Sequence, residues 1–210
     1  MDTSVAVGPL NAFLNTRGAQ FTTPTPGTGF IQAPPSGGPQ GGFETFFNNL
    51  TLDSIFGVFS PNRIFSPTNS NITDIGFFIP GTNGLDPATV SGFGAIFTDV
   101  DLANSTRIQF FGTSNNLLFD EFVPAGAGDK SFSFLGAIGD AAEQIFRVRI
   151  TSGNAPIGPS AEAGGVDLVA MDDFLYSEPR GVPDSGSGLT LLGLAMVFLL
   201  FWHRRSLAVS

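Results

Sequence analysis

The sequence predicts an all-β fold, namely an antiparallel β-sandwich of jelly-roll type that is followed by one C-terminal hydrophobic helix. The 210 residues include 27 Gly, 15 Pro and 23 Phe, a mixture of turn formers and a strand-forming aromatic residue. Strand-like runs recur roughly every 10 to 15 residues, and no helical period separates them, as in sandwich domains. Apolar and polar residues alternate over 145–151, which indicates a half-buried antiparallel strand.

The chain divides into four parts by composition. Residues 1–42 are rich in loop formers, and we expect 11–32 to add strands to the domain that follows. Residues 43–176 form the predicted sandwich. Residues 177–188 are a linker with a short polar motif, and 189–205 combine an apolar helix with a basic end.

The individual strands follow from short apolar runs between turn residues. Glycines within the long central run, 90–100, predict a β-bulge there. In the alternating run, Val148 and Ile150 face one way while Arg147 and Arg149 face the other. The expected strand-like segments are, in order, 54–59, 64–65, 75–79, 90–100, 107–111, 117–123, 132–138, 145–151 and 166–176.

Charge and residue usage exclude several classes of function. The net charge is −9 and Lys130 is the only lysine, so the basic surface that nucleic acids require is missing. The chain has no cysteine, which excludes disulfides and thiolate metal sites. Its one histidine, His203, lies in the tail, so the sandwich has no imidazole for a Ser-His-Asp or Cys-His site.

Two pairs of aspartates are the candidate cation ligands. Asp99 and Asp101 are two residues apart, a spacing that places both on one face of a strand. Asp172 and Asp173 lie near the end of the last expected strand. We expect no cofactor, but because carboxylate oxygens suit a hard cation, calcium is the one candidate, with these four residues as its ligands.

An alternative role for the same aspartates is structural. A lone carboxylate in a sheet is costly unless it is paired or hydrogen-bonded. The four aspartates would then cap turns or accept hydrogen bonds from the backbone. Arg147 and Arg149 are the natural charged partners under this alternative.

The C-terminal residues predict a membrane-spanning tail. The apolar run from Leu189 to Trp202, extended by Gly186 to Gly188, reaches the low end of the length that a spanning helix needs. Arg204 and Arg205 follow it and predict a cytoplasmic C-terminus, so the domain would lie outside the membrane. Residues 1–10 lack the basic and apolar regions of a signal peptide, and we therefore expect the true start to lie upstream of Met1.

The tail resembles the VPDSG class of PEP-CTERM-like sorting domains found in bacteria. A five-residue motif, the apolar helix and a basic end occur in the order typical of these signals. The matching residues are Val182, Pro183, Asp184, Ser185 and Gly186, followed by the helix and by Arg204 and Arg205. The resemblance implies that an exosortase-type membrane transpeptidase recognises the motif and processes the tail. Segments 90–102, 147–154 and 167–176 also resemble exported proteins that carry such tails.

These observations favour an exported, non-enzymatic protein of the cell surface or extracellular matrix. The resemblance implies delivery to the cell envelope or to an extracellular polysaccharide. One alternative is a carbohydrate-binding module assisted by calcium, although Tyr176 is the only tyrosine and Trp202 lies in the tail, so aromatic platforms are scarce. A carboxylate glycosidase is a further alternative, but no motif selects a pair of acids for it.

Overall fold

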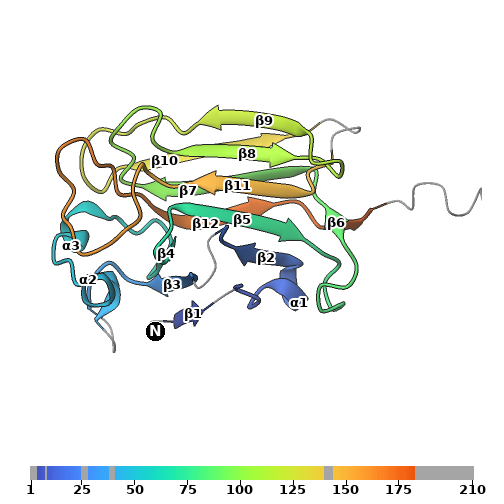
Figure 1. Cartoon of the computed structure of the whole chain (residues 1–210), viewed down its shortest axis with the longest axis horizontal. Helices are drawn as coiled ribbons and strands as arrows, with labels where there is room; N and C mark the ends of the chain where they lie inside the picture. The colour runs from blue at the N-terminus through green and yellow to red at the C-terminus, as the bar shows by residue number, and fades with distance from the viewer. Residues whose placement is uncertain (1–3, 8, 25–27, 38–40, 140–143, 183–210) are drawn as a thin grey trace, which may run out of the picture.

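The computed structural model describes residues 4–7, 9–24, 28–37, 41–139 and 144–182, which form two packed antiparallel sheets (Figure 1). The strand order is β1-β3-β4-β12-β7-β10 in the six-stranded sheet and β2-β5-β11-β8-β9 in the five-stranded sheet, while β13 pairs only with β6. This arrangement confirms the predicted all-β sandwich. The strands are β1 Ser4–Val7, β2 Ala19–Thr22, β3 Gly29–Ala33, β4 Ile64–Pro67, β5 Ile72–Phe77, β6 Ala88–Thr89, β7 Gly92–Thr98, β8 Arg107–Phe111, β9 Leu117–Phe122, β10 Phe132–Ile138, β11 Arg147–Thr151, β12 Ala170–Tyr176 and β13 Arg180–Gly181.

Three short helices occur in the described part of the chain, and none of them is long enough to cross a bilayer. They are α1 Leu14–Arg17, α2 Gly42–Phe47 and α3 Leu52–Ile55. The predicted apolar helix of residues 189–205 lies outside the described residues. Helix α3 replaces the strand expected at 54–59, because Leu52 and Ile55, three residues apart, are both buried and so share one helical face.

The alternation that predicted strand β11 is present in the structure. Val148 and Ile150 have no exposed surface, whereas Arg147 and Arg149 are half-buried on the opposite face. Strand β11 pairs with β5 on one side and with β8 on the other, so it is an interior strand of the five-stranded sheet. The alternation of apolar and polar residues in β11 therefore indicates a strand with one face in the core and the other face near solvent.

The bulge expected in residues 90–100 lies instead in the neighbouring strand. Strand β7 pairs with β10 in continuous register, but its pairing with β12 shifts between Met171 and Phe174. The glycines of β7 have a different use, since a Cβ atom on Gly94 would lie 2.8 Å from the ring of Phe134. They leave room for an aromatic ring on the outer face of the sheet.

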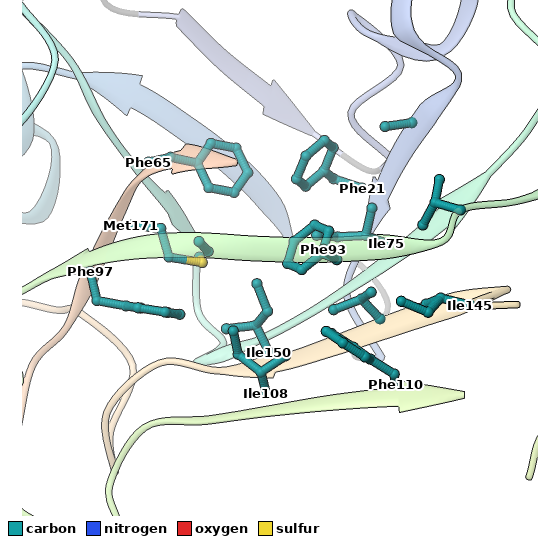
Figure 2. Packing of buried hydrophobic residues seen from close by; sticks show 14 of the residues in the cluster. Phe21, Phe65, Ile75, Phe93, Phe97, Ile108, Phe110, Ile145, Ile150 and Met171 are labelled. Atoms are coloured by element: carbon teal, nitrogen blue, oxygen red, sulfur yellow. The ribbon is translucent and has the colours of Figure 1, made fainter. Parts of the chain in front are cut away.

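Phenylalanine fills the space between the two sheets. Figure 2 shows Phe93 of β7 between Phe21 and Phe110 from other strands, while Phe97 of β7 extends toward Ile108 and Ile150. Edge-to-face contacts such as Phe21 with Phe65, at 5.4 Å between centroids, are the favoured geometry for such rings. Core packing thus explains part of the abundance of Phe.

A second apolar cluster lies where α2 and α3 meet the six-stranded sheet. It joins Phe43 of α2 and Leu52 of α3 to Ile31 of β3 and Ile64 of β4, and it also contains Leu168. Leu168 belongs to the long loop 152–169 that connects β11 with β12, and this loop lies at the same end of the sandwich as the helices (orange, at the left of Figure 1). The sequence predicted strand from residue 166, but β12 begins at Ala170.

Candidate metal centre

Three carboxylates meet at the end of the sandwich where β7 stops. Asp99 and Asp101 directly follow β7, and Glu162 comes from the loop 152–169. One oxygen of each residue can be chosen such that all three lie within 4.8 Å of one another. Such a grouping of like charges requires either protons or a cation to hold it together.

Asp99 is the most unusual member of the group. Its side chain has no exposed surface, and neither carboxylate oxygen has a hydrogen-bond partner among the residues that the structure describes. Burial, reinforced by the charges of Glu162 and Asp101, raises the pKa of Asp99 from 3.8 to about 8. Its φ of 69° lies in the left-handed region, at the point where β7 ends.

The two neighbouring acids are also held in conditions that disfavour their charge. The Oδ1 atom of Asp101 is buried and unpaired within the described part of the chain, and burial raises the pKa of this residue. Glu162 is half-buried, and burial raises its pKa as well. Its Oε1 atom accepts a hydrogen bond of 2.7 Å from the backbone N–H of Leu168, which fixes the side chain within its own loop.

Asp167 supports the centre without presenting a free oxygen to it. It accepts hydrogen bonds from the backbone N–H groups of Asp101, at 3.1 Å, and Leu102, at 3.4 Å, and from the Ser105 hydroxyl. Its own N–H donates to Oδ1 of Asn154 at 2.9 Å. Asp167 therefore ties the loop 152–169 to the segment that carries Asp99 and Asp101.

Gly153 makes this arrangement sterically feasible. Its φ is 68°, and a Cβ atom at this position would lie 2.1 Å from the backbone oxygen of Asp167. Only glycine combines this backbone conformation with so close an approach. Neither Gly153 nor Glu162 was singled out from the sequence, because nothing in the local spacing connects them to Asp99.

The structure separates the four predicted calcium ligands into two groups. Asp172 and Asp173 lie at the bulge of β12 and bind the turn at Ser60 instead of joining the three-carboxylate group. Asp172 accepts the N–H of Phe59 at 2.7 Å and the Ser60 hydroxyl at 3.0 Å, and Asp173 accepts the same hydroxyl at 2.8 Å. Asp172 thus has the structural role that was the alternative to calcium binding, because its carboxylate accepts hydrogen bonds from the backbone.

The predicted arginine partners bind elsewhere. Arg147 and Arg149 both contact Asp74 of β5, at 2.9 Å and 2.7 Å. Their pairing with Asp99, Asp101, Asp172 or Asp173 was therefore wrong. Strand pairing explains the difference, because Arg149 lies directly opposite Asp74 in the register of β11 and β5.

The predicted sorting motif falls almost wholly outside the described residues. Val182 is described, and its N–H donates to the carbonyl of Pro87 at 3.4 Å. The remaining residues of the motif and of the basic end lie beyond it. They are Pro183, Asp184, Ser185, Gly186, Arg204 and Arg205.

No known family model, curated protein or solved structure matches the chain. The donor atoms of the centre indicate which metals it suits. Asp99, Asp101 and Glu162 offer only oxygen ligands, which suit calcium or magnesium better than the softer metals that favour nitrogen or sulfur.

Proposed function

We propose that this chain is an exported, non-enzymatic β-sandwich protein that binds one structural calcium ion through Asp99, Asp101 and Glu162. The observation that carries the proposal is Asp99, a fully buried carboxylate whose two oxygens have no hydrogen-bond partner in the described part of the chain. An unpaired buried acid is costly in free energy. A divalent cation between the three carboxylates turns that cost into an attraction.

Calcium fits the donors better than magnesium. The ligands come from two irregular segments, the turn after β7 and the loop 152–169, and calcium tolerates variable geometry with 6 to 8 oxygens. Magnesium demands a small octahedral site and keeps several waters. Three carboxylates supply a first set of oxygens for calcium, and backbone carbonyls and water would complete the shell.

The ion would act as a clamp on the end of the sandwich. It would join the end of β7, in the six-stranded sheet, to the loop that leads from β11 into β12. Leu168 of this loop packs in the cluster under α2 and α3, so ordering the loop also secures that cluster. This position supports a role in stability, which suits a protein that works outside the cell.

We also propose that the sandwich is a jelly roll. Four strands of one sheet, in the order β4-β12-β7-β10, face four of the other in the order β5-β11-β8-β9. Two interlocking Greek keys generate this alternation between sheets. The order supports the jelly-roll assignment, with β1, β2 and β3 as additions at one edge.

The proposal that the protein is exported depends on its C-terminal tail. We propose that an exosortase-type enzyme recognises residues 182–186 and releases the domain to the cell surface or to an extracellular polysaccharide. Strand β6, which pairs with β13 just before Val182, lies at the end of the sandwich opposite the loop 152–169 (Figure 1). Cleavage there would leave the proposed calcium centre untouched. Mass spectrometry of the mature protein tests this step, since an intact Ser210 would contradict processing.

Calorimetric titration tests the metal centre directly. The full-length chain, stripped with a chelator, is expected to bind one calcium ion and to bind magnesium more weakly. Asp99→Asn should abolish the binding, whereas Asp129→Asn, which changes an exposed acid nearby, should weaken it only slightly. Equal binding by wild type and Asp99→Asn would contradict the proposed site.

Carbohydrate binding is a second candidate, and a groove beside β12 favours it. The groove has a volume of about 570 Å³ and combines the aromatic ring of Tyr176 with the charged groups of Arg17, Asp173 and Glu178. Rings edged by hydrogen-bonding groups suit sugar binding. A glycan array probed with and without chelator tests this candidate. Glycan binding that disappears in chelator would be calcium-assisted, whereas glycan binding in this groove would persist in chelator.

A further inference from the structure

Strand β10 forms one edge of the six-stranded sheet, and no other strand of the described residues pairs with its outer side. It pairs with β7 over all seven residues from Phe132 to Ile138 in continuous register. The strand contains no charge and no proline. Exposed edges of this kind are templates for pairing with another strand, and most proteins disrupt them with charges, prolines or bulges.

The edge of the other sheet shows the contrast. Strand β9 carries Asp120 and Glu121, and its pairing with β8 shifts between Phe110 and Phe111. Acidic residues and a bulge are both devices that prevent edge-to-edge association. The two edges lie on the same side of the sandwich (upper part of Figure 1), and among the described residues only β9 carries these two devices.

The free hydrogen-bonding groups of β10 can be assigned from its inner side. Asp99 N–H donates to the Ser131 carbonyl at 3.0 Å, and Gly139 N–H donates to the Ser91 carbonyl at 2.8 Å. Because antiparallel bonds alternate along a strand, the odd-numbered residues bond to β7. The N–H and C=O groups of the even-numbered residues therefore point away from the sheet. These residues are Phe132, Phe134, Gly136 and Ile138.

Three of these four residues carry large apolar side chains on the outer face, and the fourth is a glycine. Phe132, Phe134 and Ile138 are 45%, 56% and 86% exposed. Phe134 and Ile138 border a groove of about 610 Å³ that also includes Leu175 of β12. Helices α2 and α3 pack against β3 and β4. The segment after α3 reaches β10 only at its start, where the rings of Phe59 and Phe132 lie 5.7 Å apart among the described residues.

We propose that β10 pairs with β10 of a second copy of this chain, antiparallel and across a twofold axis at Leu135. This is the one register that pairs the whole strand with itself. It sets Phe132 opposite Ile138 of the second copy and Phe134 opposite Gly136 of the second copy. The two six-stranded sheets then form one continuous sheet of twelve strands.

Charge and shape favour a second copy as the occupant. Twofold pairing places the same patch on both sides, so the patch must tolerate itself. An uncharged strand brings no like charges together, although the chain as a whole carries −9. The ring of Phe134 lies over Gly94 and Gly136 of its own sheet, and in the dimer the residue opposite Phe134 is Gly136, which adds no side chain of its own to the interface.

Cysteine cross-linking tests the register, because the chain has no cysteine of its own. Residues that face each other at a non-hydrogen-bonded pair have Cα atoms about 4.5 Å apart, within the range of a disulfide. Leu135→Cys in the full-length chain should therefore give a disulfide-linked dimer under mild oxidation. Leu117→Cys, at an exposed position of β9, is the control and should not become disulfide-linked. Equal cross-linking of both variants, or none in Leu135→Cys, would overturn the proposal.

Sedimentation velocity provides a second test that needs no oxidation. The wild-type chain should associate as its concentration rises, and Ile138→Lys should weaken this association at least tenfold. Ile138 is 86% exposed, so the variant should keep the wild-type melting temperature. Leu117→Lys should associate like wild type. Association that persists in Ile138→Lys would assign the contact to another part of the chain, such as the apolar tail, and would overturn the proposal.

Discussion

The Oδ1 atom of Asp167 accepts a hydrogen bond of 3.1 Å from the backbone N–H of Asp101, so one acidic residue positions the chain segment that carries another. Asp167 meets its hydrogen-bonding needs through Leu102 and Ser105 as well. Asp99, next to this segment, has no such partner among the described residues. The contrast separates a supporting acid from an acid that is free to bind a cation.

Replacing Asp167 should disrupt the support. Asp167→Asn leaves one acceptor oxygen for three donors, so we expect the free energy of unfolding to fall by about 1–3 kcal/mol. Calcium affinity should fall with it, because Asp101 loses its anchor. Urea denaturation measures the first effect and calorimetry the second. Asp129→Asn serves as the control, and an effect of equal size in that variant would contradict the assigned role.

Gly153 offers a matched pair of substitutions. Gly153→Ala places a Cβ atom 2.1 Å from the backbone oxygen of Asp167, whereas Gly164→Ala in the same loop meets no atom within 4 Å. Both glycines have a positive φ, so in both variants the alanine is strained by the left-handed backbone conformation. Only Gly153→Ala should lose calcium binding and melt at a clearly lower temperature. Equal losses in the two variants would show that backbone conformation, and not the close approach, decides the outcome.

Asp74 should be important for the five-stranded sheet. It binds both Arg147 and Arg149, and its side chain is only 14% exposed. Asp74→Asn is expected to destabilise the fold by about 2–4 kcal/mol, since it leaves two arginines without their charged partner. Asp120, the partner of Arg107, is more exposed than Asp74. Asp120→Asn should therefore lower the free energy of unfolding by less than about 1 kcal/mol. Chemical denaturation measures the free energy of unfolding of both variants. A larger loss in Asp120→Asn than in Asp74→Asn would contradict the role assigned to Asp74.

The pH dependence of the metal-free protein follows from Asp99. Its pKa is about 8 in the folded chain and 3.8 ordinarily, so between these values the folded state holds a proton that the unfolded state releases. Stability in chelator should therefore fall as pH rises from about 4 to 8. Asp99→Asn should show a shallower decline, and the other acids with raised pKa values account for what remains. Identical slopes for the two proteins, measured by thermal melting, would contradict the burial of Asp99.

The sequence predicted the fold class because strand signals are local. The alternation around Val148 and the turn residues between runs report the immediate neighbours of each residue. The helix at Leu52 was missed, because four residues give too few turns for a helical period. The bulge was expected at the glycines of β7 but lies in β12, since either strand of a pair can hold the extra residue.

The candidate site could be predicted only in part. Asp99 and Asp101 were found because two acids close in sequence are visible without a fold. Glu162 joins them only through the path of the loop 152–169, and no pattern in one sequence reveals that path. Asp172 and Asp173 showed the same local signal, yet the bulge turns them toward Ser60. Spacing thus identified acidic pairs but could not tell which pair would share a site.

Thermal melting of wild type and Asp99→Asn, each with chelator and with calcium, tests the central claim most directly. Without metal the substitution removes a buried carboxylate that lacks a partner, so Asp99→Asn should melt higher than wild type at pH 8. With calcium the order should reverse, because only wild type gains stability from the ion. A shift of about 2–4 °C is expected for each kcal/mol. A wild-type melting temperature that calcium leaves unchanged would contradict the proposed metal centre.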